Sequence, residues 1–142
     1  AKTYRVTPML RLFNGIMKRL LPFGIAPPGM YLLTVRGRKT GKLYSTPVSP
    51  VEAGGKRWLV SPYGEQSWVK NARAAGEVTL RRGGTTETLR ITELSPEESA
   101  PILRRYINRE KITQPYFDVA PDAPLEAFVA EAPRHPVFLL TS

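Results

Sequence analysis

The sequence of 142 residues contains no cysteine, which excludes disulfides, thiol nucleophiles and thiolate metal sites. Its single histidine, His135, belongs to no recognisable catalytic or metal-binding motif, so we interpret it as a structural or surface residue and expect no metal. No apolar run approaches the roughly 18 residues that span a bilayer, and no signal peptide is apparent. The length predicts one domain over residues 1–142, and the absences are consistent with a cytoplasmic protein, which is the localisation we expect.

Acidic residues are scarce in the first two thirds of the chain. Residues 1–90 hold 16 Lys and Arg against 4 Asp and Glu, a net charge of +12, whereas residues 91–142 hold 5 against 8, a net charge of −3. A field of positive sign attracts nucleic acid, anionic lipid or an anionic small molecule, and a solvated basic surface is the plain alternative. The basic residues cluster at turns and lack the repeated aromatic platform of single-strand binders, so we expect no nucleic-acid partner.

Hydrolytic signatures are also missing from the sequence. The carboxylates show no paired spacing of the kind that glycosidases use, and no nucleophile elbow is present. An enzyme with this sequence would therefore take its difficult chemistry from a cofactor.

What the sequence does contain is a series of short apolar and β-branched runs separated by glycine and proline turns. We expect strands over residues 30–36, 43–48, 57–61, 78–82, 85–94 and 136–140. We expect helices over residues 7–21, 66–75, 95–109 and 125–131, and a loop over 113–124. This order predicts an α+β protein, mainly β, built as a small antiparallel barrel with flanking helices.

The first expected helix, over residues 7–21, is amphipathic. Thr7 is a typical N-cap and Pro8 a typical first helical residue, and apolar side chains follow them at helical spacing. The basic side chains that flank the apolar face are Arg11, Lys18 and Arg19. The helix is expected either to cap one end of the core or to lie on a membrane or an apolar substrate, so peripheral membrane association stays open.

The densest basic cluster lies on a glycine-flanked turn after the strand at 30–36. Gly37 and Gly41 allow the backbone to turn tightly and to approach a ligand closely, and free N–H groups in such a turn can bind an anion. The polar side chains of this turn are Arg36, Arg38, Lys39, Thr40 and Lys42. The pattern is neither a Walker loop nor a dinucleotide fingerprint. It predicts a site for phosphate or carboxylate, with a solvent-exposed basic turn as the alternative.

A second candidate region follows the strand at 57–61. The turn Ser61-Pro62-Tyr63-Gly64 leads into a helix that carries Trp68, Asn71 and Arg73. A helix start presents unpaired N–H groups and the positive end of the helix dipole, and an aromatic side chain beside it can cover a flat ring. An ordinary core role for Trp68 is an equally good interpretation.

These features occur in an order that resembles the deazaflavin (F-420)-dependent nitroreductase family. The strand and turn at 31–42 are similar to the family's phosphate-loop strand, and Thr46-Pro47-Val48 is similar to its second strand. Residues 58–64 and 68–74 resemble its ring-binding turn and its Trp-x-x-Asn helix, and residues 135–140 resemble its last strand. The ordered set is more specific than the Gly-Arg-Lys-Thr-Gly element alone.

The resemblance, which covers residues 25–140, implies a split β-barrel of the flavin-reductase type. It implies coenzyme F-420, an 8-hydroxy-5-deazaflavin with a phosphate and a polyglutamate tail, and hydride transfer to a quinone, enone or nitroaromatic acceptor. By position, the implied cofactor contacts are Arg38, Lys39, Thr40 and Gly41 for the phosphate, Arg36 and Lys42 for the acidic tail, Thr46, Pro47 and Val48 for the ring, Ser61, Pro62, Tyr63 and Gly64 for the ring edges, and Trp68 and Asn71 for support of the pocket. We place Tyr106 and Tyr116 on the substrate side as catalytic candidates, with Tyr116 as a proton or hydrogen-bond donor.

Two alternatives share the same fold. One is a lipid-binding or fatty-acid-binding protein, which the apolar face at 7–21 favours, and the other is an FMN-binding reductase. The expected partner is a small apolar or aromatic acceptor molecule, and the expected oligomeric state is a monomer or a homodimer.

Overall fold

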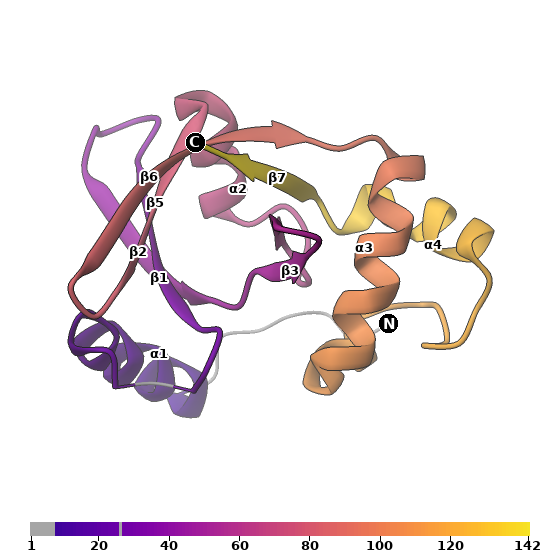
Figure 1. Cartoon of the computed structure of the whole chain (residues 1–142), viewed down its shortest axis with the longest axis horizontal. Helices are drawn as coiled ribbons and strands as arrows, with labels where there is room; N and C mark the ends of the chain where they lie inside the picture. The colour runs from indigo at the N-terminus through magenta and orange to yellow at the C-terminus, as the bar shows by residue number, and fades with distance from the viewer. Residues whose placement is uncertain (1–7, 26) are drawn as a thin grey trace.

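The computed structural model describes residues 8–25 and 27–142, and within them seven strands form one antiparallel sheet (Figure 1). The strands are β1 (Tyr31–Arg36), β2 (Leu43–Val48), β3 (Val51–Ala53), β4 (Lys56–Val60), β5 (Glu77–Arg82), β6 (Thr85–Glu93) and β7 (Val137–Thr141), in the spatial order β2-β1-β5-β6-β7-β4-β3. The helices are α1 (Pro8–Leu20), α2 (Ser67–Ala75), α3 (Pro96–Arg109) and α4 (Leu125–Glu131), with short 3-10 helices η1 (Leu21–Phe23), η2 (Lys111–Tyr116) and η3 (Ala132–Arg134). The predicted α+β split barrel with flanking helices is confirmed.

The sheet curls, and α2 lies within the curl (Figure 1). Leu33 and Val35 of β1 are buried against Val69 and Ala72 of α2. Successive residues of a strand point to opposite faces, so these two β1 side chains share the inner face of the sheet. Gly76 ends α2 with φ 75° and is followed at once by β5, which keeps the helix close to the sheet.

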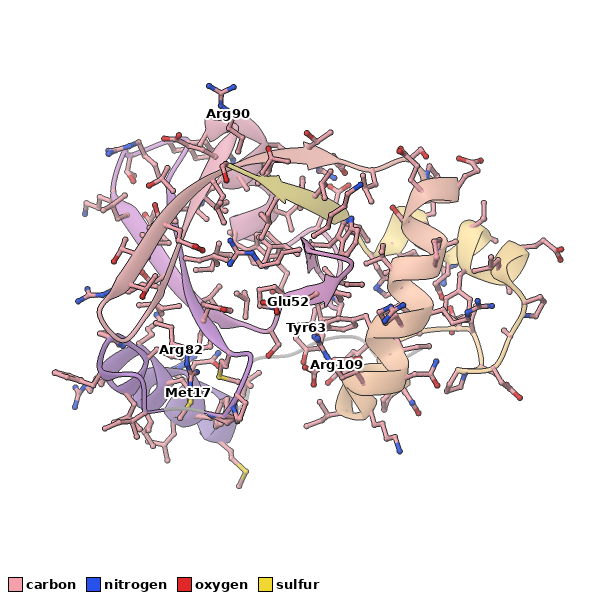
Figure 2. The ribbon with its side chains drawn as sticks, in the orientation of Figure 1. Met17, Glu52, Tyr63, Arg82, Arg90 and Arg109 are labelled. Carbon is pink, nitrogen blue, oxygen red and sulfur yellow. The ribbon has the colours of Figure 1, made fainter. Side chains whose placement is uncertain are left out.

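Helices α3 and α4 pack on a second buried cluster, beside β3, β4 and β7 (Figure 1). Ser95 caps α3, since its hydroxyl accepts the Glu98 N–H at 3.2 Å while the Glu98 carboxylate accepts the Ser95 N–H at 3.1 Å. At the other end of α3, Arg109 donates to the carbonyl oxygens of Ser49 and Pro50 at 2.8 and 3.0 Å (Figure 2). The helix is therefore fixed at both ends, and Arg109 ties it to the connection between β2 and β3.

Helix α1 lies against the outer face of β1. Met17 and Leu21 are buried there against Leu32, which points away from the inner face. The predicted first helix is confirmed from Pro8 onward, while the expected N-cap Thr7 lies outside the described residues. No helix in the described ranges combines the length and the apolar character needed to cross a membrane.

One guanidinium group fastens the connection between η1 and β1. Arg82, at the end of β5, donates to the carbonyl oxygens of Gly24, Pro27 and Met30 at 3.3, 3.0 and 2.8 Å. Arg82 is labelled in Figure 2, and the strand that carries it, β5, contacts η1. The position of α1 therefore depends on the β5–β6 hairpin as well as on its own apolar packing.

The loop predicted over 113–124 is wrong in its first part, because residues 111–116 form η2. The Thr113 hydroxyl donates to the Glu110 carbonyl oxygen at 2.6 Å, and the Phe117 N–H donates to that of Gln114 at 3.1 Å. The prolines of this segment indicated a loop, but η2 contains Pro115 as its fifth residue, and short 3-10 helices tolerate such a position.

Candidate functional site

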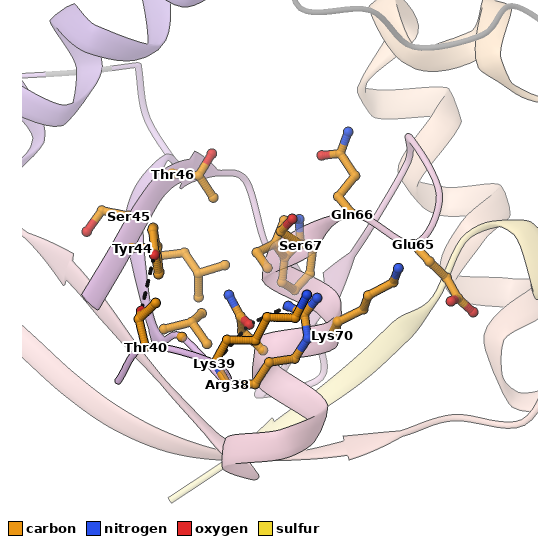
Figure 3. Close-up of a pocket in the computed structure, with 15 residues that line it drawn as sticks. Arg38, Lys39, Thr40, Tyr44, Ser45, Thr46, Glu65, Gln66, Ser67 and Lys70 are labelled. Carbon is orange, nitrogen blue, oxygen red and sulfur yellow. Dashed lines mark hydrogen bonds between the residues drawn. The ribbon is translucent and has the colours of Figure 1, made fainter. Parts of the chain in front are cut away.

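A cavity of about 730 Å³ opens between the β1–β2 hairpin and the first turns of α2 (Figure 3). Its volume lies in the range of small-molecule sites. The residues that line it are Leu33, Val35, Gly37, Arg38, Lys39, Thr40, Tyr44, Ser45 and Thr46 on the hairpin side, and Glu65, Gln66, Ser67, Trp68, Lys70 and Asn71 on the helix side. Leu33 and Val35 are buried and make one wall apolar.

The loop between β1 and β2 is held in shape by its own hydrogen bonds. The Gly37 N–H donates to the Lys42 carbonyl oxygen at 2.6 Å, and the Gly41 N–H donates to that of Gly37 at 3.0 Å. Gly41 adopts φ 73°, a left-handed conformation that favours glycine. The Arg36 guanidinium donates to the Gly41 carbonyl oxygen at 2.8 Å. Arg36 therefore braces the loop from outside the cavity.

Asn71 of α2 holds the same loop from the cavity side. Its side-chain oxygen accepts the backbone N–H of Arg38 at 3.1 Å and a guanidinium N–H of the same residue at 2.7 Å. The asparagine is 5% exposed, so its amide needs partners inside the protein. Asn71 therefore supports the cavity by joining α2 to the β1–β2 loop through these two hydrogen bonds.

The loop presents two backbone donors and several positive charges. Among the described residues, the N–H groups of Lys39 and Thr40 donate to no protein acceptor. The cationic side chains in the lining are those of Arg38, Lys39 and Lys70, which lie along one side of the cavity (Figure 3). Glu65, an acidic residue of the lining, is paired with Arg73 at 3.4 Å. The arrangement suits an anionic group.

Tyr44 forms the outer side of the cavity and packs onto Gly37. A Cβ atom at position 37 would lie 2.5 Å from a Tyr44 ring carbon, so any larger residue there would displace the tyrosine ring. The Tyr44 hydroxyl lies 3.3 Å from the Thr40 hydroxyl. Gly37 thus serves a close approach between the loop and an aromatic side chain.

The predicted ring-edge turn lies beside the cavity rather than in its lining. The Ser61 hydroxyl donates to the Gly64 carbonyl oxygen at 2.5 Å, and the Gln66 N–H donates to the same oxygen at 2.9 Å. The Tyr63 ring packs edge-on against Tyr116, with centroids 4.9 Å apart. The turn therefore leads into the lining residues 65–67 and contacts η2 on its other side.

The structure divides the predicted site residues into two groups. Six of them line the cavity together: Arg38, Lys39, Thr40, Thr46, Trp68 and Asn71. The lining does not include Arg36, Gly41, Lys42, Pro47, Val48, Ser61, Pro62, Tyr63, Gly64, Tyr106 or Tyr116. Pro47 is paired with Leu32 in the β1–β2 register and so faces α1, on the other side of the strand from Thr46.

Tyr106 lies in the core beneath α3, 7% exposed, rather than in the cavity. Burial raises the pKa of its phenol above the ordinary value, and the nearby Glu110 adds to this effect. Tyr116 packs against the same core and against Tyr63. The spacing of these tyrosines along the chain carried no information about which face of α3 or η2 meets the site.

Several lining residues were missed at the sequence level, chiefly Tyr44, Gln66, Ser67 and Lys70. Tyr44 was accessible in principle, since strand alternation places it on the same face as Thr46. Lys70 lies one residue before Asn71, and Ser67 opens α2. The start of a helix and its first turn offer donors to a ligand, which is the signal that points to these residues.

Comparison with known proteins gives a family and a fold. The family model described as F420H(2)-dependent quinone reductase matches residues 4–132. No curated protein sequence matches the chain. A solved F420-H2 dependent reductase (FDR-A) is similar at 23% identity and a TM-score of 0.56, over 80% of this chain and 94% of that one. A domain-swapped dimer is similar at 21% identity and a TM-score of 0.57, over 94% and 99% of the two chains. A NimC/NimA family protein from Clostridium acetobutylicum is similar at 15% identity and a TM-score of 0.54, over 95% and 88%.

The fold and the cavity define a split-barrel protein with a pocket suited to an anionic ligand. The chain belongs to the F420H(2)-dependent quinone reductase family. It is an oxidoreductase that uses coenzyme F420 and transfers a hydride to a quinone-type acceptor, as the sequence resemblance predicted. This assignment favours the reductase over the lipid-binding and FMN-binding alternatives.

Proposed function

We propose that the cavity between the β1–β2 hairpin and α2 is the coenzyme F420 site, with the cofactor phosphate on the loop 37–42. The observation that carries the proposal is the pair of free N–H groups at Lys39 and Thr40, in a loop that Asn71 holds in place. The cationic lining and the volume of about 730 Å³ fit a polyanionic cofactor of this size. The apolar wall of Leu33 and Val35 is the surface offered to the ring.

When bound, coenzyme F420 supplies the hydride, and the protein positions the acceptor and excludes water. Two of the lining hydroxyl groups, those of Thr40 and Tyr44, are 3.3 Å apart, and Ser45 lies 2.9 Å from Thr34. The hydroxyl groups of Thr46 and Ser67 form no hydrogen bond to the rest of the described protein. They are therefore the groups that orient a quinone carbonyl, while a proton donor at Tyr116 stays a prediction.

The acceptor class is a quinone, and narrower assignments to enones or nitroaromatics depend on the shape of the pocket. An aromatic acceptor finds an aromatic partner in Trp68, which lines the cavity and lies 6.0 Å from the Phe138 ring, centroid to centroid. Stacking on such a side chain is favourable for flat rings.

The most direct test replaces a single lysine of the loop. Removing the Lys39 ammonium by Lys39→Ala should weaken F420 binding about tenfold, the effect of losing one charge-assisted contact. Lys56→Ala is the matched control, because Lys56 is exposed on the β3–β4 turn away from the cavity lining. Affinity is measured by quenching of deazaflavin fluorescence. Equal affinities of the wild type and Lys39→Ala would contradict the proposed phosphate site.

We also propose that α1 contacts an anionic membrane, where quinone acceptors dissolve. Exposed apolar side chains cover one side of α1: Met9, Leu12, Phe13 and Ile16, of which Met9 is 81% exposed. Arg11, Lys18 and Arg19 are exposed beside them, which suits a surface of negative charge. A peripheral helix of this kind lies in the interface rather than across the bilayer.

Vesicle co-sedimentation tests the membrane contact. The variant Leu12→Ser/Ile16→Ser should reduce binding to phosphatidylglycerol vesicles several-fold, because both apolar side chains leave the interface. Ile112→Ser is the control, since Ile112 is 80% exposed on η2 and not on α1. Equal sedimentation of all three proteins would exclude α1 as the contact.

A further inference from the structure

The lone histidine of the chain is buried next to the candidate site. His135 follows η3, is 3% exposed and stacks face to face on Phe117, with ring centroids 3.7 Å apart and an interplanar angle of 11°. A polar ring held this closely in an apolar environment needs a partner for its N–H group.

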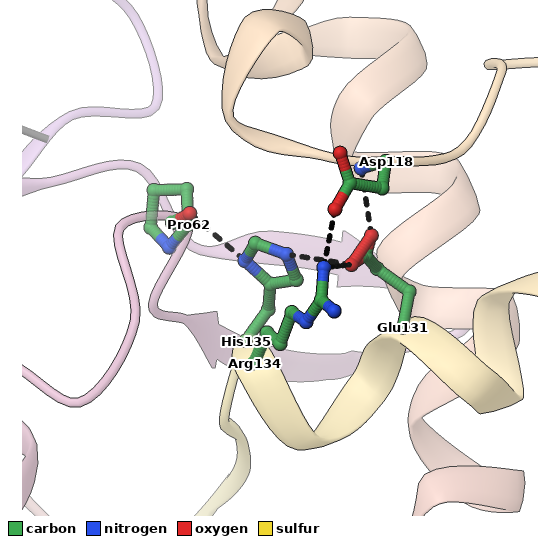
Figure 4. Close-up of polar contacts among 5 residues, drawn as sticks. All are labelled: Pro62, Asp118, Glu131, Arg134 and His135. Carbon is green, nitrogen blue, oxygen red and sulfur yellow. Dashed lines mark hydrogen bonds and ion pairs between the residues drawn. The ribbon is translucent and has the colours of Figure 1, made fainter. Parts of the chain in front are cut away.

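One nitrogen of the ring has such a partner. The Nδ1 atom of His135 lies 2.8 Å from the carbonyl oxygen of Pro62 (Figure 4). A carbonyl oxygen accepts but never donates, so the proton of a neutral ring is on Nδ1. The other nitrogen, Nε2, has no hydrogen-bond partner among the described residues. Burial lowers the pKa of His135, although the Glu131 carboxylate opposes this effect. The lowered pKa favours the neutral form of the imidazole ring.

The carboxylate that faces Nε2 is occupied by other groups. Glu131 is 4% exposed, and its Oε2 accepts the Asp118 N–H at 2.8 Å. Its Oε1 lies 3.4 Å from the Arg134 guanidinium and 3.7 Å from Nε2 of the histidine, which is beyond a hydrogen bond. Arg134 is also bonded to the Asp118 carboxylate. The groups around the ring are thus already paired, and a flipped imidazole would lose its bond to Pro62.

The carbonyl that His135 holds belongs to the turn that leads into the cavity. Ser61, the residue before Pro62, makes two more hydrogen bonds in this turn. Its N–H donates to the Pro136 carbonyl oxygen at 2.9 Å, and its hydroxyl donates to the Gly64 carbonyl oxygen at 2.5 Å. Residues 65–67, directly after this turn, line the cavity and begin α2. Asn71, one turn further along α2, holds Arg38 of the loop.

We propose that His135 is a positioning residue for the cofactor cavity: its Nδ1–H group fixes the Pro62 carbonyl, and so sets where residues 65–67 start α2 beside the loop. The inference rests on the proposed function, because it takes this cavity as the F420 site. His135 itself is not part of the lining and has no role in the chemistry.

Two substitutions separate the hydrogen bond from the bulk of the ring. His135→Phe keeps a flat ring on Phe117 but leaves the Pro62 carbonyl without a donor. His135→Asn loses the stacking but keeps a donor, since the amide nitrogen of asparagine occupies about the place of Nδ1. His135→Phe should raise both the Kd and the KM for F420 about fivefold with kcat unchanged at saturation, whereas His135→Asn should stay within about twofold of the wild type. Equal losses in the two variants would overturn the proposal.

Loss of stability alone is controlled by Ile107→Val, a conservative change in the fully buried core under α3. If the proposal holds, this variant lowers the unfolding temperature without changing the Kd for F420. A parallel fall in affinity in Ile107→Val would mean that general destabilisation explains the His135→Phe result, and would overturn the positioning role.

Two measurements on the cofactor-free protein keep the test independent of the proposed function, and the first of them needs no variant. Nitrogen NMR of the wild-type imidazole should find the neutral ring with its proton on Nδ1, and a proton on Nε2 would overturn the proposal. Hydrogen exchange at residues 61–66 should be faster in His135→Phe than in His135→Asn, with the β6 amides unchanged; equal exchange would also overturn it. If Lys39→Ala binds F420 like the wild type, the proposed site fails, whatever these two experiments show of the turn.

Discussion

The side-chain oxygen of Asn71 accepts two hydrogen bonds from Arg38, one from its backbone N–H at 3.1 Å and one from its guanidinium at 2.7 Å. The two residues are 33 positions apart in the chain and belong to different walls of the cavity. Among the described residues, the next two N–H groups of the loop, those of Lys39 and Thr40, donate to no protein acceptor. The loop is therefore preorganised for an anion by a residue of the opposite wall.

Asn71→Ala is expected to weaken F420 binding about tenfold and to lower the free energy of unfolding by about 1–2 kcal/mol, because two N–H groups of Arg38 lose their shared acceptor. Asn71→Asp keeps an acceptor oxygen at the same place but adds a negative charge beside the anion site, so it should retain more stability than Asn71→Ala and still lose affinity. Fluorescence titration and urea unfolding measure the two effects. An alanine variant with wild-type affinity would show that the loop does not need its anchor.

Gly37→Ala is expected to cost about 1–2 kcal/mol of unfolding free energy, because the new Cβ atom would lie 2.5 Å from the Tyr44 ring. The φ angle of Gly37 is outside the left-handed region, so the cost is steric. The double variant Gly37→Ala/Tyr44→Ala should therefore be less destabilised by the alanine at 37 than the single variant is. Additive losses in urea unfolding would contradict this explanation.

The stability of the protein should depend on pH through His135. Burial lowers the folded-state pKa of this residue below the ordinary histidine value of about 6.5. Below pH 6.5 the unfolded chain thus binds the proton more readily, and the free energy of unfolding falls as the pH drops through 6.5 toward the folded pKa. Above about pH 7.5 this contribution is constant.

Urea unfolding of the wild type and His135→Asn between pH 5 and 8 measures this contribution. The wild type should lose stability toward pH 5, and the asparagine variant should lose less of it over the same window. Identical slopes for the two proteins would assign the pH dependence to other groups.

Arg82→Met is expected to lower the free energy of unfolding by about 2 kcal/mol, because three carbonyl oxygens lose a charged donor. Since these carbonyls lie between η1 and β1, limited proteolysis should also cut the chain faster near α1. Arg81→Met is the control, as Arg81 is the exposed neighbour on the same strand. Equal cleavage rates in the two variants would show that α1 is held by apolar packing alone.

Most of the fold could be predicted from local signals. The capping pair Ser95 and Glu98, Gly76 after α2, and the glycine pair at 83–84 mark element ends by their backbone chemistry, and all of them lie where the sequence placed them. The segment 111–116 was missed because a proline inside it, Pro115, indicated a loop, whereas a short 3-10 helix can contain proline.

The candidate site was predictable on its loop and less so elsewhere. The glycines and basic residues of the loop are adjacent in the sequence, so the sequence alone predicted Arg38, Lys39 and Thr40, which line the cavity. Pro47 was placed with Thr46, although alternation along β2 puts neighbours on opposite faces. The link between His135 and Pro62 spans 73 positions, and a contact of that length leaves no local pattern in the sequence.

An NMR titration of the isotopically labelled protein with coenzyme F420 tests the central claim most directly. If the phosphate binds to the loop 37–42, the backbone N–H resonances of Lys39 and Thr40 should shift most. In Lys39→Ala, the N–H resonances at positions 39 and 40 should shift much less at the same cofactor concentration. The N–H resonances of the β3–β4 turn should stay in place. Shifts that cluster on α3, or that leave Lys39 and Thr40 unchanged at saturation, would contradict the account.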